Sequence, residues 1–199
     1  MITIVGAGPG DLKKMTYEAV EAIEKADRVV AFSRLANTLR PIRKDIMAVK
    51  RLNEAEVLLD PSLDVVVVVS GDPLFFGLAG ALRAKGIAVD RIVPGLSSMS
   101  CAAAAWGIPW QSMRAFSFHG RGPQVEALLR EPLSCVLLDR NFTADDLSKA
   151  LAECGAKGVI HGASYLSYER EKIVTAPIGA DVAVDEDLAL AVIELELEE

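Results

Sequence analysis

The chain has 199 residues, of which 51% are hydrophobic and 25% charged, and its formal net charge is -7. This apolar fraction excludes an intrinsically disordered chain, and the length is enough to bury one large core or two smaller ones. The longest strictly apolar runs are far shorter than the ~18 residues of a membrane span, and the excess of acid disfavours nucleic acid as a partner.

The chain opens directly on an apolar segment, residues 2–5, with no basic stretch before it. We therefore expect no signal peptide and a cytoplasmic location. Cys101, Cys135 and Cys154 are odd in number, widely spaced and without a Cys-x-x-Cys pair. That pattern favours reduced, buried thiols over disulfides or a zinc site, so no metal is expected.

The first half of the chain alternates short apolar runs with helical patterns, which is typical of an α/β protein with a parallel sheet. The run of five valines at 65–69 has no polar alternation, as in a strand that is covered on both faces at the centre of such a sheet. The expected strands are residues 2–5, 28–32, 46–49, 65–70 and 89–93, and the expected helices are residues 16–26, 35–40, 54–59 and 77–85.

The character of the chain changes at residues 105–114, where both tryptophans lie close to Gly107 and Pro109. We interpret this segment as a joint, with an α/β domain at residues 1–106, a linker at 107–113 and a second α/β domain at 114–199. A helix at residues 98–105 precedes the joint. The second domain is expected to have strands at 115–118, 135–139, 158–161, 172–175 and 188–195, and helices at 125–131 and 144–153.

Three glycine-rich loops each follow a predicted strand of the first domain. They are residues 6–11 (GAGPGD), 70–73 (SGDP) and 94–98 (PGLSS). Open α/β sheets bind ligands at the carboxyl ends of their strands, so three such loops predict one site lined by backbone. For the first loop alone, a tight turn with no ligand is the other interpretation.

The first loop does not fit a dinucleotide. Asp11 stands where the Gly-x-Gly-x-x-Gly pattern needs its third glycine, and Pro9 removes an amide that would hold a phosphate. The loop is therefore predicted to bind a ligand without phosphates. In the second loop, Asp72 and Pro73 can also start a helix running from Leu74, and we leave capping and ligand contact both open at Asp72. Ser97 and Ser98 can likewise cap the next helix.

The segments GAGPGD, SGDPLFFG (residues 70–77) and PGLSS, in this order, resemble the tetrapyrrole methylases, and the likeness covers essentially the whole chain. It implies an α/β tetrapyrrole methylase fold of two α/β/α domains with mainly parallel sheets, a homodimer, and S-adenosylmethionine bound in the cleft between the domains. The short length and the FHGR segment at 118–121 most resemble the members that methylate carbon 5 of cobalt-precorrin-7 or precorrin-6Y in cobalamin biosynthesis.

The resemblance also implies site residues. The tetrapyrrole would lie beside the first loop, against Gly10 and Asp11, and its many carboxylates would pair with Arg34, His119 and Arg121. An ordinary surface charge is the alternative for each of these three, and a cap of the helix opening at Lys13 is the favoured one for Asp11. The cofactor pocket would be lined by Pro9, Ser70, Gly71, Asp72, Phe75, Ser97, Ser98, Leu138, Ala163 and Ser164.

No side chain is assigned to the chemical step, and His161, within an apolar strand, is expected to be a core histidine. A decarboxylating methylase could act as a separate partner. Two other functions stay open. One is a family member with a different substrate, either another tetrapyrrole, a modified protein histidine or ribosomal RNA. The other is a non-catalytic nucleotide-binding module in a larger assembly.

Overall fold

The computed structural model describes residues 1–196 and divides the chain into two compact units, with the boundary between Ser97 and Ser98. The boundary lies earlier than the joint expected after Trp106. Helix α5 (Ser98–Trp106) belongs to the second unit because it packs against that unit's strand β10 (Ala189–Leu195). The tryptophan-rich segment thus follows the first element of the second unit.

The first unit is built on a five-stranded, fully parallel sheet in the order β3-β2-β4-β1-β5. All five valines of β4 are buried at its centre, as the β-branched run predicted. The strands lie where the sequence placed them: β1 (Ile2–Gly6), β2 (Arg28–Phe32), β3 (Ile46–Val49), β4 (Val65–Val69) and β5 (Arg91–Val93).

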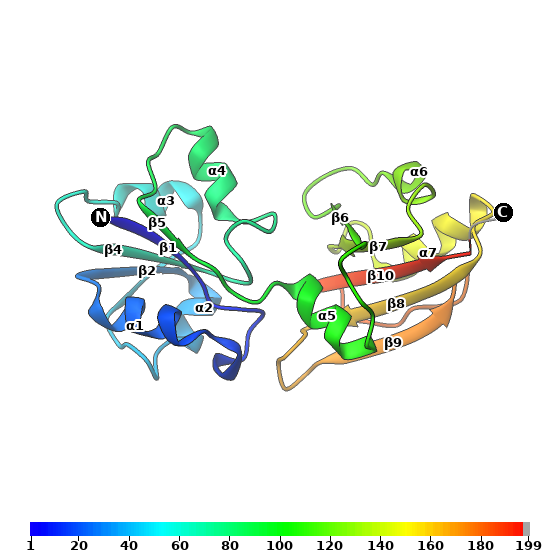
Figure 1. Ribbon diagram of the computed structural model, residues 1–199, viewed down its shortest axis with the longest axis horizontal. Coiled ribbons are helices and arrows are strands. Elements are labelled where there is room, and N and C mark those ends of the chain that lie inside the picture. The colour runs from blue at the N-terminus through cyan, green and yellow to red at the C-terminus, as the bar shows by residue number, and fades with distance from the viewer. Residues whose placement is uncertain (197–199) are drawn as a thin grey trace. The chain divides into compact units, whose positions relative to one another are not determined.

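Helices cover both faces of this sheet (Figure 1). Successive side chains of a strand point to opposite faces. Val66 and Val68 pack with the core of α1 (Tyr17–Lys25) and α2 (Ser33–Thr38). The alternate valines of β4 pack with α3 (Leu52–Val57) and α4 (Leu78–Ala84). The unit is therefore a three-layer α/β/α sandwich.

Two helix starts show how local sequence sets the boundaries. The Thr16 hydroxyl accepts a hydrogen bond from the Ala19 amide (3.1 Å) and caps α1, as its expected range implied. Helix α4 begins at Leu78 with Gly77 as its N-cap. The interpretation that Asp72 and Pro73 start a helix at Leu74 is therefore wrong, and residues 70–77 form a longer loop.

The second unit has a sheet in the order β6-β7-β10-β8-β9, in which β6 and β7 are parallel and the other described pairings are antiparallel. The expectation of a mainly parallel sheet is wrong for this unit. A parallel crossover needs a dozen or more residues, usually with a helix, and no helix lies between β8 and β10 in the described chain. The remaining strands are β6 (Arg114–Ser117), β7 (Leu133–Leu137), β8 (Gly158–Ser164) and β9 (Lys172–Pro177).

The second sheet also has helices on both faces. Helix α7 (Ala144–Glu153), which begins with a capping box of Thr143 and Asp146, shares a core with Ile160 of β8, and α6 (Val125–Leu128) packs against α7. The next residue, His161, faces the other way, and its ring centroid lies 5.1 Å from that of Trp106 of α5, with the two rings tilted by 43°.

His161 is buried, with its ring nitrogens 2.9 Å from Thr175 Oγ1 and from Glu194 Oε1. The interpretation of His161 as a core histidine is confirmed. No helix within residues 1–196 is both long and apolar enough to span a membrane.

Candidate functional site

The first sheet has a topological switch point between β1 and β4. These strands are neighbours, but the chain leaves β1 through α1 over one face of the sheet and leaves β4 through α4 over the other face. Connections that diverge in this way open a crevice at the carboxyl ends of the two strands, where α/β sheets bind ligands. We call residues 6–11, 70–77 and 94–97, which follow β1, β4 and β5, the carboxyl-edge loops.

Glycines let these loops meet backbone to backbone. Gly8 and Gly71 form an antiparallel bridge, in which the Gly71 amide donates to the Gly8 carbonyl (2.7 Å) and the Gly8 amide donates to the Gly71 carbonyl (3.2 Å). A Cβ on Gly6 would lie 2.6 Å from both the Gly71 oxygen and the Gly95 nitrogen. A side chain at Gly6 would therefore push the three loops apart. The three glycine-rich segments do converge, as predicted.

Asp72 joins the second loop to the third. Its Oδ1 accepts from the Leu74 amide (2.8 Å), and its Oδ2 accepts from the Gly95 amide (3.2 Å). The carboxylate therefore holds the turn of its own loop and fastens it to the loop that follows β5. Ligand contact at Asp72, which the sequence left open, stays a prediction.

Several amides of the carboxyl-edge loops are already engaged within the protein. They are the amides of Ala7, Gly8, Gly71, Leu74, Phe75 and Gly95. Prolines, which have no amide hydrogen, occupy positions 9, 73 and 94. Phosphate sites need several converging N–H groups. The engaged amides and the three prolines reduce what these loops can offer a phosphate, which is consistent with a ligand whose reactive part is uncharged or cationic.

Exposed apolar side chains surround the same loops. Leu74, Phe76 and Leu96 are 69%, 45% and 44% exposed. Phe76 adopts a left-handed backbone conformation with φ of +50°, and its ring packs edge-on against that of Phe75 at 5.0 Å. A bulky residue in that conformation is strained, and such strain clusters at functional sites. We call the side chains of Leu74, Phe76 and Leu96 the apolar rim. The sequence analysis did not predict it, and the only signal for it was the LFF segment that follows SGDP.

The remaining first-unit candidates lie at the same edge. Pro9 and Gly10 belong to the first loop, and Ser70 follows β4 directly. Asp11 Oδ1 accepts from the Lys13 amide (2.9 Å) and caps the short 3-10 helix at Leu12–Lys14, so the capping interpretation is confirmed. Arg34 is exposed in the first turn of α2, which starts directly after β2.

Ser97 and Ser98 lie at the start of α5. Their predicted capping role stays a prediction, as does their contact with the cofactor.

In the second unit, the predicted cofactor contacts are buried. Leu138 is 2% exposed, and Ala163 and Ser164 are fully buried. The Leu138 amide donates to the Ala189 carbonyl (3.0 Å), and the Ser164 hydroxyl accepts from the Asp185 amide (3.1 Å). The Leu138 backbone and the Ser164 side chain therefore hold neighbouring segments, and contact of the three residues with a ligand stays a prediction.

His119 and Arg121 lie on an exposed turn after β6. The His119 Nδ1 is 3.9 Å from Asp139 Oδ2, and its side chain is 73% exposed. Asp139 also accepts from the amides of Gly120 and Asn141, each at 2.8 Å. These amide hydrogen bonds, together with the charge of His119, hold the pKa of Asp139 below its usual range. Both cationic candidates are thus accessible to a ligand.

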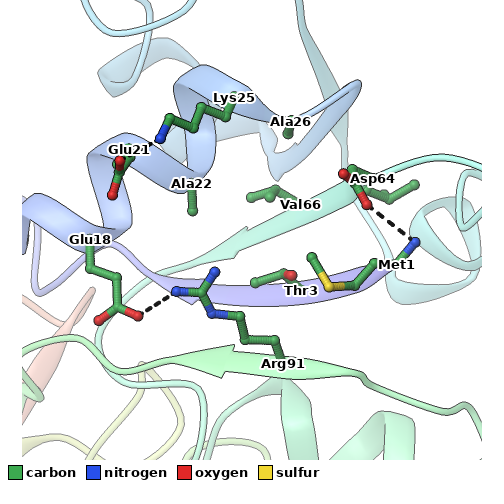
Figure 2. Close-up of a pocket in the computed structure, with 11 residues that line it drawn as sticks. Met1, Thr3, Glu18, Glu21, Ala22, Lys25, Ala26, Asp64, Val66 and Arg91 are labelled. Carbon is green, nitrogen blue, oxygen red and sulfur yellow. Dashed lines mark hydrogen bonds and ion pairs between the residues drawn. The ribbon is translucent and has the colours of Figure 1, made fainter.

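A separate cavity of about 250 Å³ lies between α1 and the sheet, next to the start of β4 and β5 (Figure 2). Its charged groups pair with one another: Arg91 with Glu18 (2.6 Å), Lys25 with Glu21 (2.5 Å), and the terminal amine with Asp64 (3.5 Å). A polar ligand would have to break these pairs. The cavity also lies away from the carboxyl ends of the strands, so we do not assign the site to it.

The sequence profile of the Tetrapyrrole (Corrin/Porphyrin) Methylases matches residues 1–181. The chain belongs to the tetrapyrrole methylase family. Among curated members, the cobalt-precorrin-7 C(5)-methyltransferase of Salmonella typhimurium is 31% identical over 191 residues, covering 90% of this chain and 92% of that protein. A probable cobalt-precorrin-7 C(5)-methyltransferase of Methanocaldococcus jannaschii is 29% identical and covers 87% of each chain.

Solved structures of tetrapyrrole methylases share the fold. The precorrin-6Y methylase (cbiE) of Archaeoglobus fulgidus superposes with a TM-score of 0.78 at 23% identity, covering 99% of both chains. A uroporphyrin-III C-methyltransferase of Thermus thermophilus, complexed with S-adenosylhomocysteine, has a TM-score of 0.78 at 25% identity and covers 97% of this chain and 96% of that one. The family resemblance seen in the glycine-rich segments is thus confirmed.

Proposed function

We propose that this protein is an S-adenosylmethionine-dependent methyltransferase that methylates carbon 5 of cobalt-precorrin-7 or precorrin-6Y in corrin biosynthesis. The observation that carries the proposal is the match, over 90% of the chain, to a relative with that activity in its name. The carboxyl-edge loops support it independently, because they lie at the switch point of the first sheet.

The residues at the switch point fit the cofactor. When bound, S-adenosylmethionine supplies a methyl group activated by a sulfonium cation. Six amides of these loops already donate within the protein, and exposed apolar side chains surround the loops, which suits such a cation better than a phosphate. A carboxylate against the sulfonium would stabilise the ground state more than the transition state, in which that charge is disappearing. Asp72 is already bound to two amides, which is consistent with a positioning role.

The protein then accelerates methyl transfer mainly by aligning the methyl donor with the tetrapyrrole carbon. Holding two reactants in line can supply about 7–11 kcal/mol of a barrier, and loops fixed backbone to backbone are suited to it. We propose that Gly10, Asp11, Arg34, His119 and Arg121 contact the tetrapyrrole. The cations would pair with its carboxylates, whereas Asp11, already a helix cap, would contribute through its place in the first loop.

We further propose that the protein is a homodimer in the cytoplasm, where buried thiols such as those of Cys101 and Cys135 stay reduced. Light scattering coupled to size-exclusion chromatography tests the dimer. A separate decarboxylating methylase stays a proposed partner, which co-purification of the two enzymes tests.

The reaction is tested by incubating the protein with methyl-labelled S-adenosylmethionine and late precorrins, with mass and NMR analysis of the product. We expect a single added methyl group on carbon 5. Uroporphyrinogen III serves as a second substrate, because a Bacillus subtilis uroporphyrinogen-III C-methyltransferase is 34% identical over 54% of this chain. Methylation of that substrate instead would favour another family activity.

Calorimetric titration distinguishes the proposed methyltransferase from the alternative of a non-catalytic nucleotide-binding module. We expect S-adenosylhomocysteine to bind and NAD not to bind. Binding of the dinucleotide without S-adenosylhomocysteine would overturn the proposal in favour of a nucleotide-binding module.

A further inference from the structure

Basic residues are unevenly distributed along this acidic chain. Residues 28–51 contain seven of the 21 Lys and Arg residues but only one of the 28 Asp and Glu residues. This stretch runs through β2, α2 and β3. Its basic residues are Arg28, Arg34, Arg40, Arg43, Lys44, Lys50 and Arg51.

Two of these residues have structural roles. Arg28 donates to the Leu58 carbonyl (2.8 Å). Arg43 donates to the Ile23 carbonyl (3.0 Å) near the end of α1 and pairs with Asp45 (2.8 Å). Such contacts explain why a basic residue stands at these positions without reference to a ligand.

Arg34, Lys50 and Arg51 lie at one edge of the sheet, and we call them the basic edge. Arg34 lies in the first turn of α2, and Lys50 and Arg51 directly follow β3. The Ser33 hydroxyl donates to the Val49 carbonyl (3.1 Å) and ties the start of α2 to the end of β3. Because β2 and β3 are parallel to β4 and β1, the basic edge lies at the same end of the sheet as the carboxyl-edge loops.

The charges of the basic edge face solvent. Arg34, Lys50 and Arg51 are all exposed. Within residues 1–196, neither the Lys50 ammonium nor the Arg51 guanidinium forms an ion pair. The Glu54 carboxylate accepts from the backbone amide of Lys50 (2.8 Å). By contrast, Lys25, Lys85 and Arg91 of the same unit are paired with glutamates.

We propose that the basic edge binds peripheral carboxylates of the tetrapyrrole, which makes Lys50 and Arg51 substrate-binding residues beside Arg34. This inference rests on the proposed function. Strand β3 is two strand spacings from β4, about 10 Å, so a broad flat polyacid lying on the carboxyl-edge loops extends to it. The guanidinium of Arg51 can take a carboxylate in two parallel hydrogen bonds, and the ammonium of Lys50 adds a second charge.

The test uses cobyrinic acid, a corrin with free carboxylates, and its fully esterified form as probes, in the presence of S-adenosylhomocysteine. The variant is the double substitution Lys50→Gln and Arg51→Gln. The control is Lys44→Gln, because Lys44 is also exposed but precedes β3, at the opposite end of the sheet. Conservative Arg51→Lys should restore part of the binding.

We expect the double variant to bind cobyrinic acid about tenfold more weakly, as for the loss of two exposed ion pairs, and with a shallower dependence on salt. The Lys44→Gln control should bind cobyrinic acid as tightly as the wild type. The double variant should bind the esterified probe and S-adenosylhomocysteine with unchanged affinity. Equal weakening in the control, no weakening in the double variant, or no binding of cobyrinic acid to the wild type would each overturn the inference. Failure of S-adenosylhomocysteine to bind the wild type would instead overturn the proposed function.

Discussion

The Asp72 carboxylate accepts a hydrogen bond from the Gly95 amide at 3.2 Å, across 23 positions of sequence and between loops that follow different strands. A second hydrogen bond, from the Leu74 amide at 2.8 Å, fixes the turn of its own loop. One side chain therefore sets the relative position of two of the three carboxyl-edge loops. The consequence is that Asp72 affects any ligand of these loops through the position of the loops themselves, in addition to the ligand contact that stays a prediction.

Replacing Asp72 by Ala should destabilise the protein by about 1–2 kcal/mol, because two amides lose a charged acceptor at a partly exposed site. S-adenosylhomocysteine affinity should fall as well. Asp72→Asn keeps one carbonyl acceptor, so it should lose less stability and less S-adenosylhomocysteine affinity than Asp72→Ala. Urea unfolding and calorimetric titration measure the two effects. Asp60→Ala is a matched control, because Asp60 forms the same kind of turn with Ser62 at the other end of β4. It should leave ligand affinity unchanged, and an equal loss there would contradict a specific role of Asp72.

Gly95 should not tolerate a methyl group. A Cβ at this position would overlap the backbone of Gly6 and Gly71, so Gly95→Ala should destabilise the protein by about 1–3 kcal/mol, as overpacking does, and should weaken S-adenosylhomocysteine binding. Gly80, inside α4, has open space around it. Gly80→Ala should therefore stabilise by up to about 1 kcal/mol through helix propensity. Thermal unfolding of the two variants measures the contrast, and similar melting temperatures would refute it.

The first unit was largely predictable because its signals are local. The valine run of β4 predicts a buried central strand, and the glycine-rich segments predict turns at strand ends. Strand direction in the second unit was missed because side-chain periodicity carries no information on direction. The seven residues between Ser164 and Lys172, too few for a parallel crossover, were a usable signal.

The parts of the site that were not predicted depend on tertiary contacts. The partner of Asp72 is distant in sequence, so its capping interpretation was the best local one. The exposure of Leu74 and Phe76 could not be inferred either, because apolar residues are more often buried. The Ser164 hydroxyl accepts a hydrogen bond from the Asp185 amide, a partner 21 positions away that only the fold reveals.

Asp139 should contribute to stability in a pH-dependent way. Hydrogen bonds from the Gly120 and Asn141 amides lower its pKa in the folded state. A carboxylate with a lowered folded-state pKa stabilises above the pKa of the unfolded chain, near 4 for Asp, and this stability is lost as the pH falls through the folded value. Asp139→Asn should therefore destabilise at pH 7 and flatten the acid limb of the stability curve. Urea midpoints between pH 7 and pH 2 measure this, and an unchanged acid limb would contradict it.

Two substitutions of Phe76 should change protein stability differently while changing ligand affinity in the same way. Its left-handed backbone conformation suits glycine, and for other residues it costs about 1–2 kcal/mol. Phe76→Gly relieves that cost, whereas Phe76→Ala keeps it, and both remove the same exposed ring. We expect the Gly variant to be more stable than the Ala variant by about 1 kcal/mol, while both bind S-adenosylhomocysteine or the tetrapyrrole more weakly than the wild type. Urea unfolding and calorimetry on the pair measure both. If both variants bind like the wild type, the strained ring has no part in the site, and the apolar rim must then be assigned to Leu74 and Leu96 alone.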